Sequence, residues 1–380
     1  MTRHHRARTG ALLCVLGLVT PGLGACGEGE PPRPVPPSRA ASAADVGGSA
    51  ALVRAAKREG RLNTIALPRQ WANYGGLIDG FEKKYGIKVV VSEPNDHSEQ
   101  EIDAVKRYRG GQRAPDVIDV GDSFAQSAAR QNLLAPYRVA PFDQIPPDQK
   151  DAAARWYNNY GGYVSIGCDA SRVRTCPESF ADLLRPEHKG LVAMYGQPTD
   201  AGSAFAAVYA AALANGGSFD DIRPGIDFFA RLKRVGNYNR TAPTPTTIAQ
   251  GETPISIEWD YLNLAHLDQL RGTGVKWKVS IPFDGSFSQY YAQGINKNAP
   301  HPAAARLWEE YLFTPESQNL RLVDYARPVL LAAMAKNGTL DKTLAARLPT
   351  VEGTPQFPTE AQLNKAVRTV QENWAKAVGR

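Results

Sequence analysis

The segment Glu258-Trp259-Asp260-Tyr261 has the residue types that most directly suggest binding chemistry. It follows the apolar run 255–257, which predicts a short strand, so it falls at the carboxyl end of that strand. Unpaired acids are almost never fully buried, which argues against a core role for two carboxylates between two aromatic rings. Such a group offers a cationic amine both an ion pair and an aromatic face. The alternative is that Glu258 or Asp260 caps the helix that begins near Tyr261.

Three other loops follow strand-like runs and carry polar or aromatic side chains. In an open α/β sheet, ligands bind outside the carboxyl ends of strands, at the loops that start helices. The first loop offers Trp71 and Tyr74 as an aromatic wall, or it caps a helix with Trp71 packed on the protein body. The other two loops open helices with groups that either cap the helix or contact a ligand: Asp122 and Ser123, then Thr199, Gly202 and Ser203. The third loop suits a carboxylate or phosphate, because a helix amino terminus presents free amides.

The sequence carries no recognisable catalytic or cofactor motif. An enzyme needs a nucleophile with a base, a metal cluster or a cofactor loop. The chain has no Gly-x-Ser-x-Gly, no P-loop, no His-Glu-x-x-His and no pair of histidines at ligand spacing in its mature part. We therefore expect no enzymatic activity, no cofactor and no bound metal, with a secreted hydrolase as the alternative from a different class.

The charge of the chain gives no reason to expect nucleic acid as a partner. There are 44 Lys and Arg against 38 Asp and Glu, and half of this excess comes from Arg3, Arg6 and Arg8. The remaining basic residues form no run and no stripe among aromatic side chains. A basic surface for nucleic acid is thus not expected.

The amino terminus has the layout of a secretory signal. Arg3, Arg6 and Arg8 precede an uncharged apolar run at 10–25, which is too short for a membrane-spanning helix. Its end, Leu23-Gly24-Ala25-Cys26, resembles the bacterial lipobox. We expect residues 1–25 to be removed and Cys26 to be lipidated, which would anchor the protein on the outer face of the cell membrane; an ordinary signal peptide is the alternative. Residues 26–50, rich in Pro, Ser and Ala, predict a flexible tether.

Cys168 and Cys176 are the only cysteines beyond Cys26. An even pair outside the cell suggests a disulfide that closes a small loop. A zinc site would need two further ligands, so we favour the disulfide.

Strands alternating with helices predict an α/β fold with mostly parallel sheets. The predicted strands are 62–67, 87–91, 116–120, 162–167, 191–195, 255–259, 275–281 and 290–295, and helices such as 51–59, 100–108 and 202–215 stand between them. We expect two lobes, because the body is long enough for two domains. Lobe 1 would comprise 51–160 plus about 285–330, and lobe 2 would comprise 161–284 plus about 331–380.

The stretch 177–194, with Asp182-Leu183-Leu184 and later Lys189-Gly190-Leu191-Val192-Ala193, is the most specific family signal in the chain. Further matching pieces occur in order at 59–62, 81–89, 115–121, 298–305 and 314–318. Together they resemble the two-lobed periplasmic and lipid-anchored solute-binding proteins of the ferric-ion and polyamine ABC importers.

This resemblance implies a type II periplasmic-binding-protein fold, in which crossing strands join the lobes and the lobes close over ligand. It also implies delivery of the solute to a membrane permease driven by an ATPase, and we expect a monomer. Arg327 lies in a segment that resembles a loop returning to the cleft in relatives. We favour an amine-containing solute such as a polyamine or an aminophosphonate, with ferric ion or a sugar as alternatives.

Ferric-ion members bind iron through paired tyrosines, and this chain has Tyr290-Tyr291. In those relatives, however, the pair stands where this chain has Trp259-Asp260-Tyr261. Adjacent residues of a strand also point to opposite faces of the sheet. The resemblance to iron carriers therefore does not extend to their ligand set.

Overall fold

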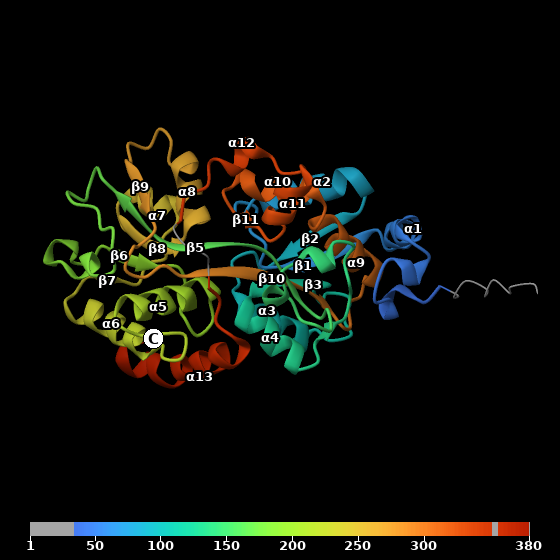
Figure 1. The fold of residues 1–380 in the computed structure, drawn as a ribbon, viewed down its shortest axis with the longest axis horizontal. Helices are drawn as coiled ribbons and strands as arrows, with labels where there is room; N and C mark the ends of the chain where they lie inside the picture. Colours follow the sequence, from blue (N-terminus) through green and yellow to red (C-terminus); the bar gives the residue numbers. More distant parts are fainter. Residues whose placement is uncertain (1–33, 352–355, 380) are drawn as a thin grey trace, which may run out of the picture. The chain divides into compact units, whose positions relative to one another are not determined.

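The computed structural model describes residues 34–351 and 356–379. The predicted signal peptide and the predicted lipidation site Cys26 lie outside these residues. The described chain is an α/β protein in which helices flank the strands of two sheets (Figure 1).

The first half of the fold, which we call lobe 1, is built on β1, β2 and β3. Strands β1 and β2 pair in parallel, and β3 pairs with β10. The elements that form it are α1 (Ser49–Glu59), β1 (Arg61–Ile65), α2 (Tyr74–Tyr85), β2 (Lys88–Ser92), α3 (Ser98–Arg107), β3 (Val117–Gly121), α4 (Asp122–Arg130), β4 (Leu134–Ala135), α9 (Pro302–Leu312) and α10 (Pro315–Val323). Helices α1 and α2 end at Gly60 and Gly86, whose positive φ angles of 68° and 67° fit glycine at a helix terminus.

The second half, lobe 2, is built on β6, β7, β8 and β9. Strand β6 pairs in parallel with both β7 and β8. Its elements are β6 (Val192–Met194), α5 (Gly202–Ala214), α6 (Arg223–Arg234), β7 (Tyr238–Asn239), α7 (Pro245–Gln250), β8 (Ile255–Trp259), α8 (Asp260–Gln269) and β9 (Trp277–Ser280). Helix α5 is buried along almost its whole length because its alanines allow close packing on all sides.

Two long strands, β5 (Tyr157–Asp169) and β10 (Ser288–Asn296), connect the halves. The first part of β5 pairs with β10, and its last part pairs with β8 and β9. All of these pairs are antiparallel, as is the pair of β10 with β3. The sheets are thus more mixed than the mostly parallel arrangement that we expected, because the crossing strands run against their neighbours.

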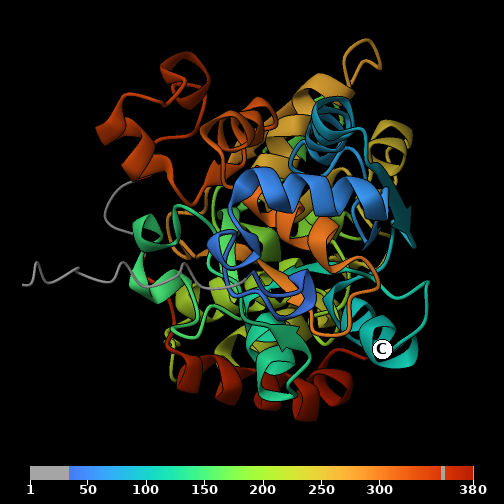
Figure 2. The same ribbon diagram turned by 90° about the vertical axis from the view of Figure 1, so that its right-hand side faces the viewer.

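The amino-terminal part of the described chain packs on the body. Ala40 is 1% exposed, and Arg306 of α9 donates from Nε to the Ala40 carbonyl at 2.9 Å. Figure 2 shows α1, in blue, lying over α9, in orange. The flexible tether expected over 26–50 is therefore folded from Pro34 onward, since buried Arg306 gives it a fixed contact.

The carboxyl-terminal elements are β11 (Arg327–Pro328), α11 (Leu331–Asn337), α12 (Lys342–Ala345) and α13 (Glu360–Ala377). Helix α12 packs on α10 of lobe 1, whereas α13 packs on α6 and on α4. Of the residues 331–380 that we assigned to lobe 2, those of α12 therefore lie beside lobe 1.

Two further expectations concern covalent and membrane structure. Cys168 and Cys176 form a disulfide with an S–S distance of 2.01 Å, which confirms the predicted bond. Over the described residues, no helix combines the length and apolar character needed to span a membrane.

Candidate functional site: a cavity between the lobes

A cavity of about 40 Å³ lies between lobe 1 and lobe 2. Its lining comes from segments that follow β1, β2 and β6, from β3 and β10, and from the start of α5. This is the place where open α/β sheets bind ligands. The side chains that line it include Trp71, Asp96, His97, Glu101, Asp119, Tyr195, Ser203 and Tyr291.

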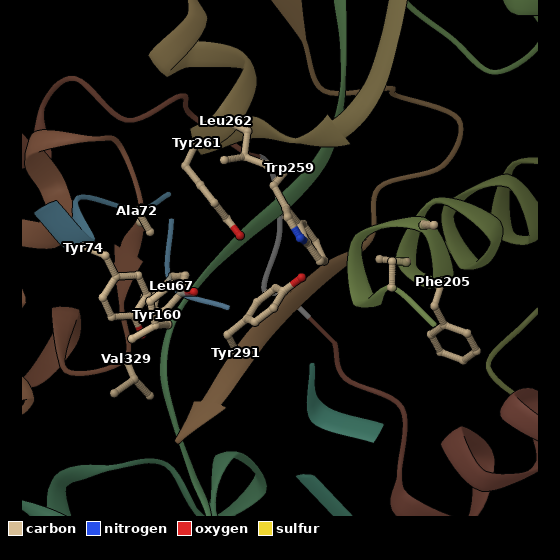
Figure 3. Close-up of a cluster of buried hydrophobic side chains, with 14 of the residues drawn as sticks. Leu67, Ala72, Tyr74, Tyr160, Phe205, Trp259, Tyr261, Leu262, Tyr291 and Val329 are labelled. Carbon is tan, nitrogen blue, oxygen red and sulfur yellow. The ribbon is translucent and has the colours of Figure 1, made fainter. Parts of the chain in front are cut away.

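Aromatic rings from both lobes and from a crossing strand form one wall of the cavity. The ring centroid of Trp71 lies 5.9 Å from those of Tyr195 and Tyr261 and 5.5 Å from that of Tyr291. In Figure 3, the polar ends of Trp259, Tyr261 and Tyr291 point toward one another. The Tyr261 hydroxyl is buried without a hydrogen-bond partner among the described residues.

Three carboxyl groups, Asp96, Glu101 and Asp119, line the same cavity. None of them forms an ion pair with a cation in the described part of the chain. Burial raises the pKa of Asp119 to about 6, and burial together with the nearby Asp119 raises the pKa of Glu101 well above its usual range. A bound cation would favour the charged form of both acids.

Asp119 is held in place by neutral side chains. Its Oδ2 accepts a hydrogen bond from the Tyr160 hydroxyl at 2.6 Å, and its Oδ1 accepts one from Gln293 Nε2 at 2.5 Å. Tyr160 in turn accepts a hydrogen bond from Trp71 Nε1 at 2.8 Å. The acid of the cavity and its aromatic wall are therefore positioned together.

The opposite side of the cavity is the amino terminus of α5. Gly202 and Ser203 line it, and Ser203 Oγ is buried without a hydrogen-bond partner among the described residues. Gly202 also stands where the lobes meet, since a Cβ added at Gly121 would lie 3.3 Å from the Gly202 Cα. A side chain at either glycine would make a tight contact with the opposite lobe, which would have to shift slightly to accommodate it.

The acids that we expected to face the cleft have partners inside the protein. Asp260 is fully buried, forms an ion pair with Arg327 and accepts a hydrogen bond from the Tyr163 amide at 3.0 Å. Glu258 pairs with His266 at 3.1 Å. Asp119 lines the cavity, whereas Glu258 and Asp260 do not, and Arg327 serves as the internal partner of Asp260.

Some of the remaining predicted site residues line the cavity, and others lie away from it. Trp71, Gly202 and Ser203 line the cavity. Trp259 and Tyr261 do not line it, but their rings pack against the lining residues Tyr291 and Trp71, respectively. Tyr74 is fully buried behind Tyr160, with the ring centroids 6.0 Å apart. Asp122, Ser123 and Thr199 do not line the cavity either.

Asp122 begins α4, and its Oδ1 has no hydrogen-bond partner among the described residues. Burial raises its pKa to about 7, while the neighbouring Asn158 side chain lowers it and Asp148 raises it. Asp122 is therefore a buried acid that lies beside the crossing strand β5 and outside the cavity.

Sequence reasoning did not single out five residues that line the cavity: Asp96, His97, Glu101, Asp119 and Tyr195. Two signals were available. Asp119 is an acid inside an otherwise apolar strand, and Asp96 and His97 follow β2 just before α3, where the rule for strand ends applies.

Tyr290 and Tyr291 point to opposite faces of β10, as expected. Tyr291 contacts Trp71 and Tyr160, whereas Tyr290 lies 5.9 Å from Phe357. The described residues also hold no group of three or more His, Cys, Asp or Glu side chains placed to bind a metal ion.

The two-lobed α/β fold, with its cavity between the lobes at the ends of strands, defines a binding protein of the periplasmic type. Residues 112–348 match the family model described as bacterial extracellular solute-binding protein. Because the match covers more than half of the chain, the protein belongs to this family. It is the solute-binding, non-catalytic component of an ABC transporter.

Solved structures share the fold at low sequence identity. The periplasmic binding protein AfuA from Actinobacillus pleuropneumoniae, with fructose-6-phosphate bound, has a TM-score of 0.67 and 18% identity, covering 84% of this chain and 98% of its own. A putative spermidine/putrescine ABC transporter protein from Listeria monocytogenes has a TM-score of 0.62 and 14% identity, covering 82% and 99%. The apo ferric ion-binding protein A from Pasteurella haemolytica has a TM-score of 0.59 and 20% identity, covering 82% and 97%. No curated protein sequence matches the chain.

Proposed function

We propose that this solute-binding protein captures a small solute carrying an ammonium group. The observation that carries the proposal is the placement of Asp119 and Glu101, two buried carboxyl groups that face a cavity walled by aromatic rings and have no cation paired with them among the described residues. An ammonium group would supply the missing charge, and the faces of Trp71 and Tyr291 would add a cation–π contribution.

The opposite end of the solute would carry an anionic or polar group. The amino terminus of α5 offers the unpaired Ser203 Oγ and the backbone at Gly202. Free amides and the helix dipole at such an end favour a carboxylate or phosphonate. The favoured solutes are thus polyamine-like or aminophosphonate-like compounds. One protein of similar fold is named for spermidine/putrescine, which supports an amine, and another was solved with fructose-6-phosphate, which supports an anionic group.

Ferric ion or a sugar is the alternative solute class. The opposed directions of Tyr290 and Tyr291 weigh against an iron site of paired phenolates. A sugar would leave the charge of Asp119 without a partner in the cavity, which is costly for a buried acid.

The test starts with a thermal-shift screen of the mature domain against amines, amino acids, phosphonates, sugars and ferric chelates. A ligand that binds only the folded state raises the melting temperature. We expect amines to give the shifts, and a shift with sugars or ferric chelates alone would replace the proposed solute class.

The second step compares Asp119→Asn with Asp227→Asn by calorimetry on the best amine. The first variant should bind at least tenfold more weakly, about 1.4 kcal/mol, because it removes the charge that meets the ammonium group. Asp227, exposed on α6, is the matched control and should leave affinity unchanged. Equal affinity of the Asp119 variant and the wild type would refute the assignment of this acid.

We further propose that Cys26 anchors the protein by lipid on the outer face of the membrane and that the protein delivers its solute to the permease as a monomer. The string Leu23-Gly24-Ala25-Cys26 after an apolar run supports the anchor.

A further inference from the structure

Arg321 of α10 lies fully buried directly behind the aromatic wall of the cavity. Its guanidinium group stands 4.2 Å from the centre of the Tyr74 ring and 4.0 Å from that of the Tyr160 ring. Nε donates to Asn159 Oδ1 at 3.0 Å, and Nη1 donates to the Ala72 carbonyl at 2.9 Å. The group is therefore fixed by two rings and two hydrogen bonds.

The two tyrosines that contact Arg321 also control the position of Asp119. Tyr160 donates its hydroxyl proton to Asp119 and accepts a hydrogen bond from Trp71. Tyr74 accepts a hydrogen bond at 3.1 Å from Gln293, which also donates to Asp119. A substitution of Arg321 would thus alter the surroundings of both Asp119 and Trp71, because the Tyr160 ring contacts Arg321 and hydrogen-bonds to both.

Arg321 also acts through its charge on two buried acids of this region, Asp119 and Glu309. Its charge lowers the pKa of Asp119, which burial raises, and it acts in the same direction on Glu309. Glu309 is completely buried, with 0% of its surface exposed. Neither of its carboxyl oxygens has a hydrogen-bond partner among the described residues. Without Arg321, these acids would face one another uncompensated.

The groups that face Asp119 come from six other elements. They are Tyr74 of α2, Glu101 of α3, Tyr160 of β5, Tyr261 of α8, Tyr291 of β10 and Arg321 of α10, with Glu309 of α9 farther behind. Burial raises the pKa of each of these tyrosines and of both glutamates. The tyrosines stay neutral near pH 7, so Arg321 is the cation among these groups, and its charge and the hydrogen bonds from Tyr160 and Gln293 together favour the charged form of Asp119.

We propose that Arg321 is a positioning and selectivity residue, which keeps Asp119 an anion near neutral pH and thereby makes the cavity prefer a cationic solute over a neutral one of the same shape. The preference for a cation rests on the proposed function. The control of the Asp119 charge does not, and it is tested without any solute.

The first experiment follows the carboxyl carbon of Asp119 by NMR as a function of pH in protein labelled with ¹³C-aspartate, with Asp119→Asn for assignment. Wild-type Asp119 should titrate near pH 6. Arg321→Gln should raise this midpoint by about one unit or more, because the favourable charge is gone. Arg321→Lys should stay within about half a unit of the wild type. Arg306→Gln, which alters an equally buried arginine away from the cavity, should leave the midpoint unchanged.

The second experiment measures the affinity for the best amine of the screen between pH 5 and pH 8.5. Arg321→Gln should lose about threefold near pH 6.5 for a one-unit shift of the Asp119 midpoint, and it should regain most of this affinity at pH 8.5, because the shifted Asp119 ionises again. An unmoved NMR midpoint, or the same loss of affinity at every pH, would show a merely structural role and overturn the inference.

Two outcomes separate this inference from the proposed function. If no amine binds the wild type but the Asp119 midpoint still moves in Arg321→Gln, the proposed function and the selectivity fail while the control of the Asp119 charge stands. If Arg321→Gln does not fold by circular dichroism, Arg321→Lys decides: a midpoint within about half a unit of the wild type supports the role of the charge, and a full-unit shift contradicts it.

Discussion

Asp119, which lines the cavity, and Asp260, which does not, are both buried aspartates with different surroundings. Asp260 meets the guanidinium group of Arg327, so its charge is compensated inside the protein. Asp119 meets hydroxyl and amide donors, and its nearest cation stands behind two tyrosine rings. A buried acid that lacks an ion pair is the one available to a cationic solute.

Asp260→Asn should therefore act on stability rather than on binding. Removing one partner leaves the buried Arg327 charge uncompensated, which costs about 3–5 kcal/mol. Urea unfolding should show this loss, while the folded variant should keep its amine affinity within about threefold. A tenfold loss of affinity with unchanged stability would return Asp260 to the list of solute contacts.

Asp122 should make stability depend on pH. Its pKa of about 7 in the folded protein exceeds the ordinary 3.8, so its contribution is fully present below pH 3.8 and is lost as the pH rises toward 7. Asp122→Asn, which stays neutral, should gain up to about 4 kcal/mol relative to the wild type above pH 7 and little at pH 4. Urea unfolding at both pH values is the measurement, and an equal difference at both would contradict the buried-acid interpretation.

At the scale of elements, the crossing strands explain why the cavity is built from distant parts of the chain. Strand β10 brings Tyr291 to the cavity and Gln293 to Asp119, and β5 brings Tyr160 between them. Strand β10 pairs with β3 of lobe 1 and with β5, and β5 continues into lobe 2, where it pairs with β8. Any movement of the lobes must therefore bend or rotate these two strands.

The disulfide between Cys168 and Cys176 ties the end of β5 to the loop that follows it. Changing both cysteines to alanine should lower the free energy of unfolding by about 2–3 kcal/mol, because the unfolded chain regains the entropy of an eight-residue loop. Chemical unfolding of the double variant measures this effect. Solute affinity should be unchanged, since neither cysteine lines the cavity.

At the scale of the whole molecule, the contact of Gly121 with Gly202 shows the lobes closed on one another. The amide of Glu99 in lobe 1 also donates to the Asp200 carbonyl in lobe 2 at 3.4 Å. A solute held between Asp119 and Ser203 would join the same two lobes, so binding and closure should stabilise each other.

Cys26→Ser should release the protein from membranes into the soluble fraction, because a thiol at this position is what a lipid anchor requires. Fractionation of cells that express the wild type and the variant, followed by immunoblotting, is the measurement. Retention of the variant in the membrane fraction would contradict lipid anchoring.

The sequence by itself determined the α/β class, the order of strands and helices, the disulfide and the family. Strand 255–259 is β8 itself, and helix 202–215 is α5 within one residue. These features are local, since they depend on apolar periodicity, turn residues and short motifs. The loops at strand ends were also predictable, because their place follows from the fold class.

Only the tertiary structure decided which acid faces the cavity. Asp260 finds Arg327 at a separation of 67 residues, and Arg321 reaches Asn159 and Ala72 across 162 and 249 residues. No local pattern reveals such pairs, because the charge of a buried side chain depends on whichever partner the folded chain brings beside it. Asp260 therefore looked like a solute contact in the sequence, while Asp119 looked like part of a buried strand.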